Sequence, residues 1–303
     1  MNVAMKRALW LGIGLCLPWG LATSVAAADN TGWIAAPPSQ DIMPDADWVT
    51  LFDQSKPLAD RQHMLANLEQ SPGLKDDPED LYRLGSLYHM GEHAPGSPVQ
   101  EDPVKATLYL GNAALHGSTL AMAKMAELKL AAGQYREAMN WAQIYSHYAL
   151  MSPASQGTAT ESYAAELVDR IKDKIDQSVM PAVMADVNSF VAQHDADIRL
   201  GMAREQAREH HTPKTPKHYY VGPLGSRASD SGIADYMLVF NADGTVATML
   251  LIDAVPRPNI GTTMRSYAAS MTLKPQDNQR PRYAWVPVLL GNHEYRMDSA
   301  HGG

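Results

Sequence analysis

The chain has 303 residues, of which 45% are hydrophobic, and a formal net charge of −8 at pH 7. This length and composition suffice for about two globular domains with a sizeable core. The negative charge argues against a binding surface for nucleic acid or anionic lipid, because both require a basic patch.

The first 28 residues have the parts of a secretory signal peptide. Lys6 and Arg7 form a charged start, residues 9–21 are mostly apolar, and small residues at 26–28 suit a cleavage site. The apolar run is short for a membrane span of roughly 20 residues, so an uncleaved anchor is the less favoured alternative. We therefore expect export to the periplasm, with release from the cell less favoured.

Signal cleavage would change what the mature chain can do. It removes Lys6 and Arg7, which takes the formal charge from −8 to −10, and it removes Cys16, the only cysteine. A mature chain without cysteine forms no disulfide and has no thiol nucleophile or thiolate ligand.

Residues 29–44 are rich in Pro, Asp and Ala and indicate a loose leader, and residues 45–207 have the apolar spacing of helices. Within them, residues 78–117 contain two short amphipathic helices. Asp77-Pro78 and Asp102-Pro103 are start signals, and Gly91 ends the first helix. Such a unit cannot bury its apolar face alone and must stack on neighbours.

This unit resembles a Sel-one-like repeat, the longer-looped relative of the tetratricopeptide repeat. The positions that match the family are Leu84, Gly85, Tyr88, Gly91, Asp102, Lys105, Ala106, Ala113, Ala114 and Gly117, and Tyr109 stands where the family usually has tryptophan. We expect Gly85 and Ala113 to allow close helix packing, and Tyr88 and Tyr109 to fill the gaps between the helices. The resemblance implies a scaffold that holds other proteins.

A second unit, at 118–151, is closer to an ordinary tetratricopeptide repeat. Helices at 45–70 and 158–207 are expected to cap the array, because two units are fewer than such arrays usually need. Pro181 indicates that residues 158–207 form either an antiparallel pair or one kinked helix. Residues 208–217, with Pro213 and Pro216, are polar and predict a linker.

Residues 218–303 are predicted to form a small α+β domain with an antiparallel sheet. Two strands flank a turn at Asp243-Gly244, a helix ends at the step from Leu273 to Pro275, and the last strand contains Pro287, which favours a sheet edge or a bulge. This order resembles the C-terminal domain of TonB-type energy transducers. The resemblance implies that a sheet edge accepts an extended peptide and that the partners include outer-membrane transporters.

The sequence contains no recognisable catalytic motif, phosphate-binding loop or dinucleotide fingerprint. His89 and His93 are four residues apart, but Gly91 lies between them and no nearby Glu completes a zinc-protease pattern. His210, His211 and His218 lie in or beside the linker. We expect no metal, no cofactor and no catalytic residue.

These features predict a non-enzymatic periplasmic adaptor, in which the helical array holds one envelope protein and the α+β domain another. Two alternatives stay open: a component of a TonB-type energy transducer, and a periplasmic hydrolase with a site that no motif reveals. A full transducer is disfavoured by the absence of a long Pro-Lys spacer.

Overall fold

The computed structural model describes residues 42–151, 159–208, 213–215, 231–278 and 280–290. Its first part is helical. The helices are α1 (Asp45–Phe52), α2 (Leu58–Glu69), α3 (Pro78–Met90), α4 (Pro103–Leu115), α5 (Thr119–Ala131), α6 (Tyr135–Ala149), α7 (Ala159–Lys172) and α8 (Met180–Ala207). They are followed by β1 (Gly232–Phe240), β2 (Val246–Val255), α9 (Asn259–Ala269) and β3 (Arg282–Leu290). The predicted α+β class, mostly helical first and with a small antiparallel sheet later, is confirmed.

The helix start signals act as the sequence predicts. The Asp77 carboxylate accepts hydrogen bonds from the backbone N–H groups of Glu79 and Asp80, and Asp102 caps α4 in the same way. A proline occupies the first position of each helix, where the missing N–H costs nothing. The helices then pack as sequence neighbours, α3 on α4 and α5 on α6.

The region expected to cap the array contains two helices rather than one kinked helix. The helix α7 ends at Lys172 and α8 begins at Met180, so Pro181 lies in the first turn of α8. Proline is tolerated there because a first-turn N–H has no partner within the helix. The helix α8 packs mainly on α6 and also contacts α4 and α3.

The three strands form an antiparallel sheet in the order β2-β1-β3, so β3 is an outer strand. This position agrees with the expectation that Pro287 marks a sheet edge or a bulge. The turn between β1 and β2 contains Gly244 at a φ of +88°, which is the left-handed backbone expected for a bulged hairpin.

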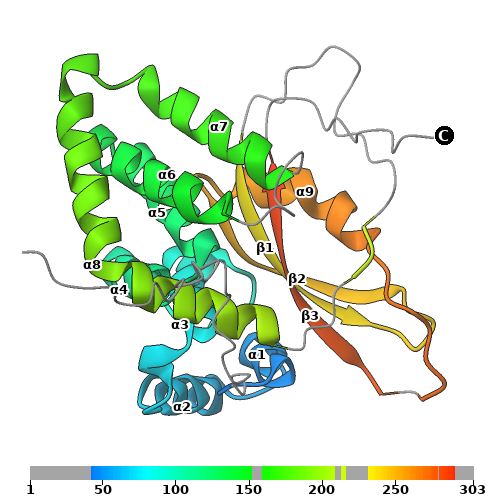
Figure 1. Cartoon of the computed structure of the whole chain (residues 1–303). Helices are drawn as coiled ribbons and strands as arrows, with labels where there is room; N and C mark the ends of the chain where they lie inside the picture. The colour runs from blue at the N-terminus through cyan, green and yellow to red at the C-terminus, as the bar shows by residue number, and fades with distance from the viewer. Residues whose placement is uncertain (1–41, 152–158, 209–212, 216–230, 279, 291–303) are drawn as a thin grey trace, which may run out of the picture. The chain divides into compact units, whose positions relative to one another are not determined.

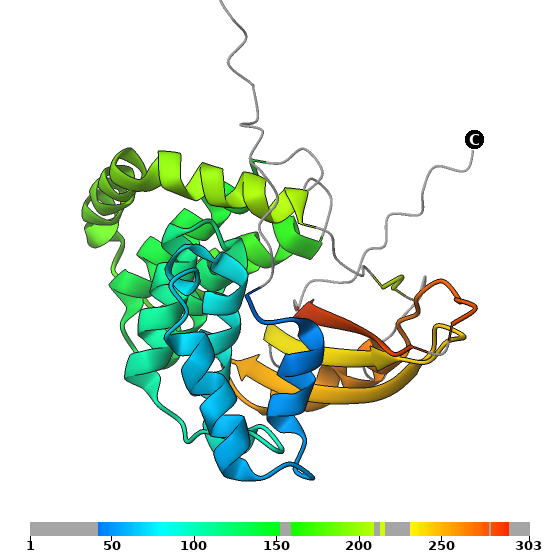
Figure 2. The same cartoon turned by 90° about the horizontal axis from the view of Figure 1, so that it is seen from below.

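Both faces of the central strand β1 are buried, and by different partners. Tyr236, Leu238 and Phe240 belong to a core with α9. Ile233 and Met237, on the opposite face, belong to the main core of the helices. Figures 1 and 2 show the sheet between α9 and the helices α1, α3, α5 and α7, which contact β2 or β3. The sheet is therefore a middle layer.

Contacts connect the two regions that the sequence prediction separates by a linker at 208–217, of which the structure describes residues 208 and 213–215. The described residues all fall within one compact unit. Arg208 is buried and pairs with acidic residues of α3, and Lys214 forms a two-hydrogen-bond bridge with Thr272. A polar, proline-containing composition predicts a break in regular structure, but it carries no information on what packs across the break.

The predicted end of the helix in the C-terminal part needs correction. The helix α9 ends at Ala269, before the predicted step at Leu273, because residues after it turn back onto the hairpin: Leu273 donates its N–H to the Gly244 carbonyl.

The signal peptide expected at 1–28 and most of the leader at 29–44 lie outside the described residues. No described helix has the length and apolarity needed to cross a bilayer.

The crossing of α8 over the end of α4 depends on a glycine. A side chain at Gly201 would overlap the backbone carbonyl of His116, whereas a Cβ at Gly111 on α4 would meet nothing within 4 Å. We predict that Gly201→Ala lowers the free energy of unfolding by about 1–3 kcal/mol, as overpacking does. Gly111→Ala is the matched control and should be neutral or stabilising, because alanine favours helix. Urea unfolding followed by circular dichroism measures both, and equal stabilities would contradict the predicted close contact.

Candidate functional site

The most unusual chemistry of the molecule is a buried ionic cluster where the helices meet the sheet. Asp235 on β1 and Asp253 on β2 are directly opposite each other in the strand register. Two like charges in such a pair repel and destabilise a sheet. Lys124 of α5 lies between them: its ammonium is 2.5 Å from Asp235 Oδ2 and also contacts Asp253 Oδ2. All three side chains are fully buried.

Neutral and weakly basic groups form the remaining hydrogen bonds to the two carboxylates. The Tyr82 hydroxyl lies 2.9 Å from both oxygens of Asp235, and Trp285 donates its indole N–H to the same carboxylate at 3.2 Å. His89 Nδ1 lies 2.7 Å from Asp253 Oδ1. Lys124 also donates to Ser86 Oγ at 2.6 Å. Each charge is thus paired and hydrogen-bonded, as burial requires.

The protonation of the cluster follows from the balance between burial and these partners. Burial by itself would lower the pKa of Lys124, but the two carboxylates outweigh it and raise that pKa. For Asp235, burial outweighs Lys124 and raises the pKa of the carboxyl group. For Asp253, burial is outweighed by Lys124 and His89, which hold the pKa below its usual range. Lys124 is therefore a cation.

The contact between Ser86 and Lys124, beside Tyr82, suggests a serine nucleophile with a lysine as its base. A charged ammonium has no lone pair with which to accept the serine proton, so Lys124 cannot activate Ser86 in this state. Both side chains are also fully buried, with none of their surface exposed. The geometry fits a structural junction that ties α3 and α5 to the sheet.

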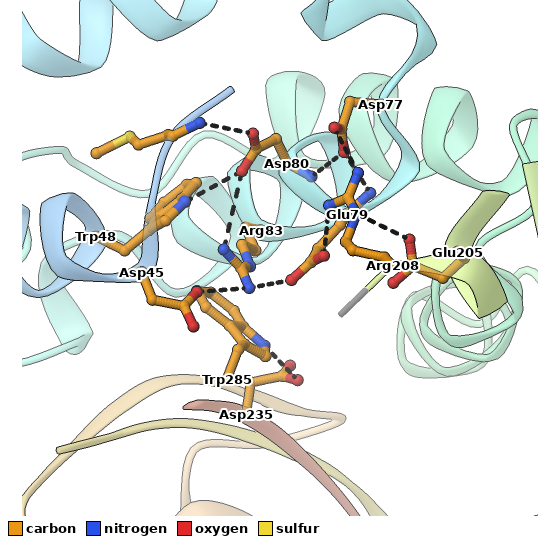
Figure 3. Close-up of polar contacts among 11 residues, drawn as sticks. Asp45, Trp48, Asp77, Glu79, Asp80, Arg83, Glu205, Arg208, Asp235 and Trp285 are labelled. Carbon is orange, nitrogen blue, oxygen red and sulfur yellow. Dashed lines mark hydrogen bonds and ion pairs between the residues drawn. The ribbon is translucent and has the colours of Figure 1, made fainter. Parts of the chain in front are cut away.

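A second polar network, shown in Figure 3, lies next to this junction and joins α1, α3, α8 and β3. The guanidinium carbon of Arg83 lies 5.9 Å from the centroid of the Trp48 ring and 4.9 Å from that of the Trp285 ring, and these two rings meet edge to face. Arg83 also pairs with Asp45 at 2.9 Å. Arg208 pairs with Asp77, the N-cap of α3, at 2.7 Å, and with Glu79 in the first turn of α3. Such desolvated cation–π contacts stabilise by about 2 kcal/mol.

Asp80 anchors the start of the described chain to α3. Its two oxygens accept the indole N–H of Trp48 at 3.1 Å and the backbone N–H of Met43 at 3.2 Å. Burial, only partly offset by Arg83, raises the pKa of Asp80 to about 7. The residue therefore changes charge near neutral pH.

A cleft of about 520 Å³, which we call the seam cleft, opens between the helical part and the sheet. One wall consists of the starts of α3 and α5 with the turn before α5, and the other consists of β3 and the end of α9. The lining is mostly apolar and includes Tyr82, Leu120, Tyr267, Met271, Trp285, Val286, Pro287 and Leu289. Clefts of this size and character are typical of binding sites.

The residues of the Sel-one-like pattern lie at the contact of α3 with α4. Leu84, Ala106, Ala113 and Ala114 are fully buried. A Cβ at Gly85 would lie 2.6 Å from Leu110 Cγ, so the glycine permits the close packing expected of it.

The two tyrosines of the pattern stack on each other rather than filling separate gaps. The Tyr88 and Tyr109 rings are 5.9 Å apart and nearly parallel, and both hydroxyls donate to Glu69, as does Lys105 at 3.1 Å. Gly91 and Gly117 have positive φ angles of 50° and 100°, which suits their places at helix ends.

The pattern residues of the C-terminal part lie away from the ionic cluster. Asp243 accepts hydrogen bonds from Thr245 within the hairpin turn, and Gly244 closes against Leu273. Pro275 is exposed. Among the described residues, no group of three or more His, Cys, Asp or Glu side chains could hold a metal ion. His210, His211 and His218 lie outside the described residues.

Sequence reasoning missed Lys124, Asp235 and Asp253. Each is a charged residue inside an otherwise apolar run, as in Ala-Met-Ala-Lys-Met-Ala around Lys124. A charge at a position that the helix or strand period assigns to the interior is the signal that could have found them, because charges are rarely buried without a partner.

We predict that Lys124→Met lowers the free energy of unfolding by about 3–5 kcal/mol, because it leaves two opposed carboxylates buried without a cation. Lys129→Met on the same helix removes a lysine whose ammonium donates to Gln134 in an exposed hydrogen bond, and should change stability by no more than about 0.5 kcal/mol. Adding Asp235→Asn and Asp253→Asn to Lys124→Met should recover part of the loss. Denaturant unfolding measures all three, and a mild Lys124→Met variant would refute the junction.

The charge of Asp80 should make stability depend on pH. Its pKa is about 7 in the folded chain against 3.8 ordinarily, so between these values the folded state holds a proton that the unfolded state releases. Stability should therefore fall as pH rises from about 4 to about 7, by on the order of 4 kcal/mol for this group. Asp80→Asn should flatten that slope, whereas Asp60→Asn, at an exposed site on α2, should keep it. Melting temperatures across this range test the difference.

Comparison of the chain with protein-family models, with curated proteins and with solved structures finds no match. The likenesses to Sel-one-like repeats and to the TonB C-terminal domain accordingly rest on the residues named above.

Proposed function

We propose that this chain is a non-enzymatic periplasmic adaptor that binds other envelope proteins. The proposal combines the signal-like first 28 residues with helix pairs that carry the Sel-one-like pattern at their contacts. In α3 and α4 the pattern residues Gly85 and Ala113 lie where the helices pack, which supports a repeat-like unit. Stacked helical units provide extended surfaces for binding proteins.

The observation that carries the proposal is the seam cleft. It is apolar, it is about 520 Å³ in volume, and one wall is the outer strand β3. An extended segment of a partner can lie beside an outer strand and place alternate side chains into an apolar groove, as in strand addition. The TonB-like order of strands and helix makes outer-membrane transporters the candidate partners within this proposal.

The packing of the sheet changes where a partner would bind. The helices α1, α3, α5 and α7 contact the chain's own sheet, so these faces are not available to a second protein in this state. We therefore place the partner at the seam, where both halves of the chain contribute to one site, instead of giving each half a partner of its own.

A site-specific crosslinking experiment tests this proposal. A photoreactive amino acid at Leu120, in the seam cleft, should crosslink an envelope protein in living cells, whereas the same amino acid at Leu58, which is 50% exposed on α2, should not. The adducts are detected by immunoblot and identified by mass spectrometry. Absence of an adduct at 120, or equal adducts at both positions, would count against a partner in the cleft.

A further inference from the structure

The ionic cluster reaches solvent at His89. Lys124, Asp235 and Asp253 have no exposed surface, whereas the side chain of His89 is 20% exposed while its ring contacts Asp253. Histidine is the side chain whose ordinary pKa allows a change of charge near neutral pH. His89 is therefore a titratable, solvent-accessible side chain that directly contacts the junction between helices and sheet.

The charge balance of the cluster depends on this histidine. Charged groups face His89 from each neighbouring element: Asp253 from β2, Lys124 from α5 and Glu101 from the loop before α4. Asp235 of β1 lies beyond Lys124, and Tyr82 of α3 donates to it. With His89 protonated, two positive charges face the two buried carboxylates. With His89 neutral and both aspartates ionised, one carboxylate charge remains uncompensated.

An uncompensated buried charge is costly, and water reaches it when the sheet moves away from the helices. The contacts that would separate are those of β2 with α3 and α5. The apolar part of the same interface, including Met237 and Ile252, opposes separation. The protonation of His89 therefore changes the opening equilibrium of an interface that is otherwise held by packing.

We propose that His89, Asp253 and Lys124 form a pH-sensitive latch that holds the sheet against the inner faces of α3 and α5 when His89 is protonated and weakens as His89 loses its proton. This latch does not depend on the proposed adaptor function.

The direction of the effect follows from the contacts of His89. Burial works to lower the pKa of His89, but the Asp253 carboxylate outweighs it and raises the pKa above 6.5. A basic group with a raised pKa stabilises the closed state fully below 6.5, and this contribution is lost as pH rises through the higher pKa of the closed state. The latch is thus tight in mild acid and weaker in mild alkali.

Hydrogen exchange of the whole chain at about pH 6 and about pH 8.5, corrected for the intrinsic rates, tests the latch. The opening constant of the β1 and β2 amides should rise by about tenfold for every unit by which docking raises the pKa of His89. The variants are made in an Asp80→Asn background, because Asp80 is also expected to change charge near pH 7. In that background His89→Gln should open equally at both pH values, His89→Lys should stay protected at both, and His63→Gln, an exposed histidine on α2, should behave as Asp80→Asn alone.

In the Asp80→Asn background, pH dependence that persists in His89→Gln would overturn the latch, and so would β1 and β2 amides that open equally at both pH values with His89 intact. If the variants do not fold, the imidazole of His89 can be titrated in the wild-type chain by NMR. A pKa above 6.5 supports the latch, and a pKa at or below 6.5 refutes it.

Discussion

The repulsion between two aspartates on adjacent strands is the constraint on which the rest of the structure depends. The register of β1 and β2 places Asp235 opposite Asp253, and neither carboxylate can be ionised inside a core without a cation. The cation is Lys124, which comes from the middle of α5. The buried charges of the sheet are therefore balanced only when the sheet packs on the helices. Met237 and Ile252 of the sheet accordingly share one hydrophobic core with the helical residues.

This dependence determines which surfaces are available for binding. The faces of α3 and α5 that would otherwise be open contact β2, and the seam cleft opens beside this contact. The Arg83 network reinforces the same seam, because Trp285 of β3 contacts Arg83 of α3 on one side and donates to Asp235 on the other. Trp285 therefore belongs to the cleft wall, to the Arg83 network and to the ionic cluster.

Local features were predicted well because their causes are local. The caps at Asp77 and Asp102, the left-handed Gly244 and the outer-strand position of Pro287 each follow from the conformational limits of the residue itself. The end of α9 was wrong by a few residues, because the backbone of Leu273 prefers the hairpin turn to another helical turn. That competition involves residues about 30 positions away and leaves no mark in the local pattern.

The helices, the hairpin, the small antiparallel sheet and their order could be predicted from the sequence, because period, capping and turn chemistry are properties of neighbouring residues. In contrast, the sequence did not reveal that Lys124 neutralises carboxylates on two strands, or that His89 and the seam cleft lie where the helices meet the sheet. The physical reason is that electrostatic balance in a buried site is a sum over groups far apart in the chain. Lys124 and Asp253 are 129 residues apart, and only folding brings them together.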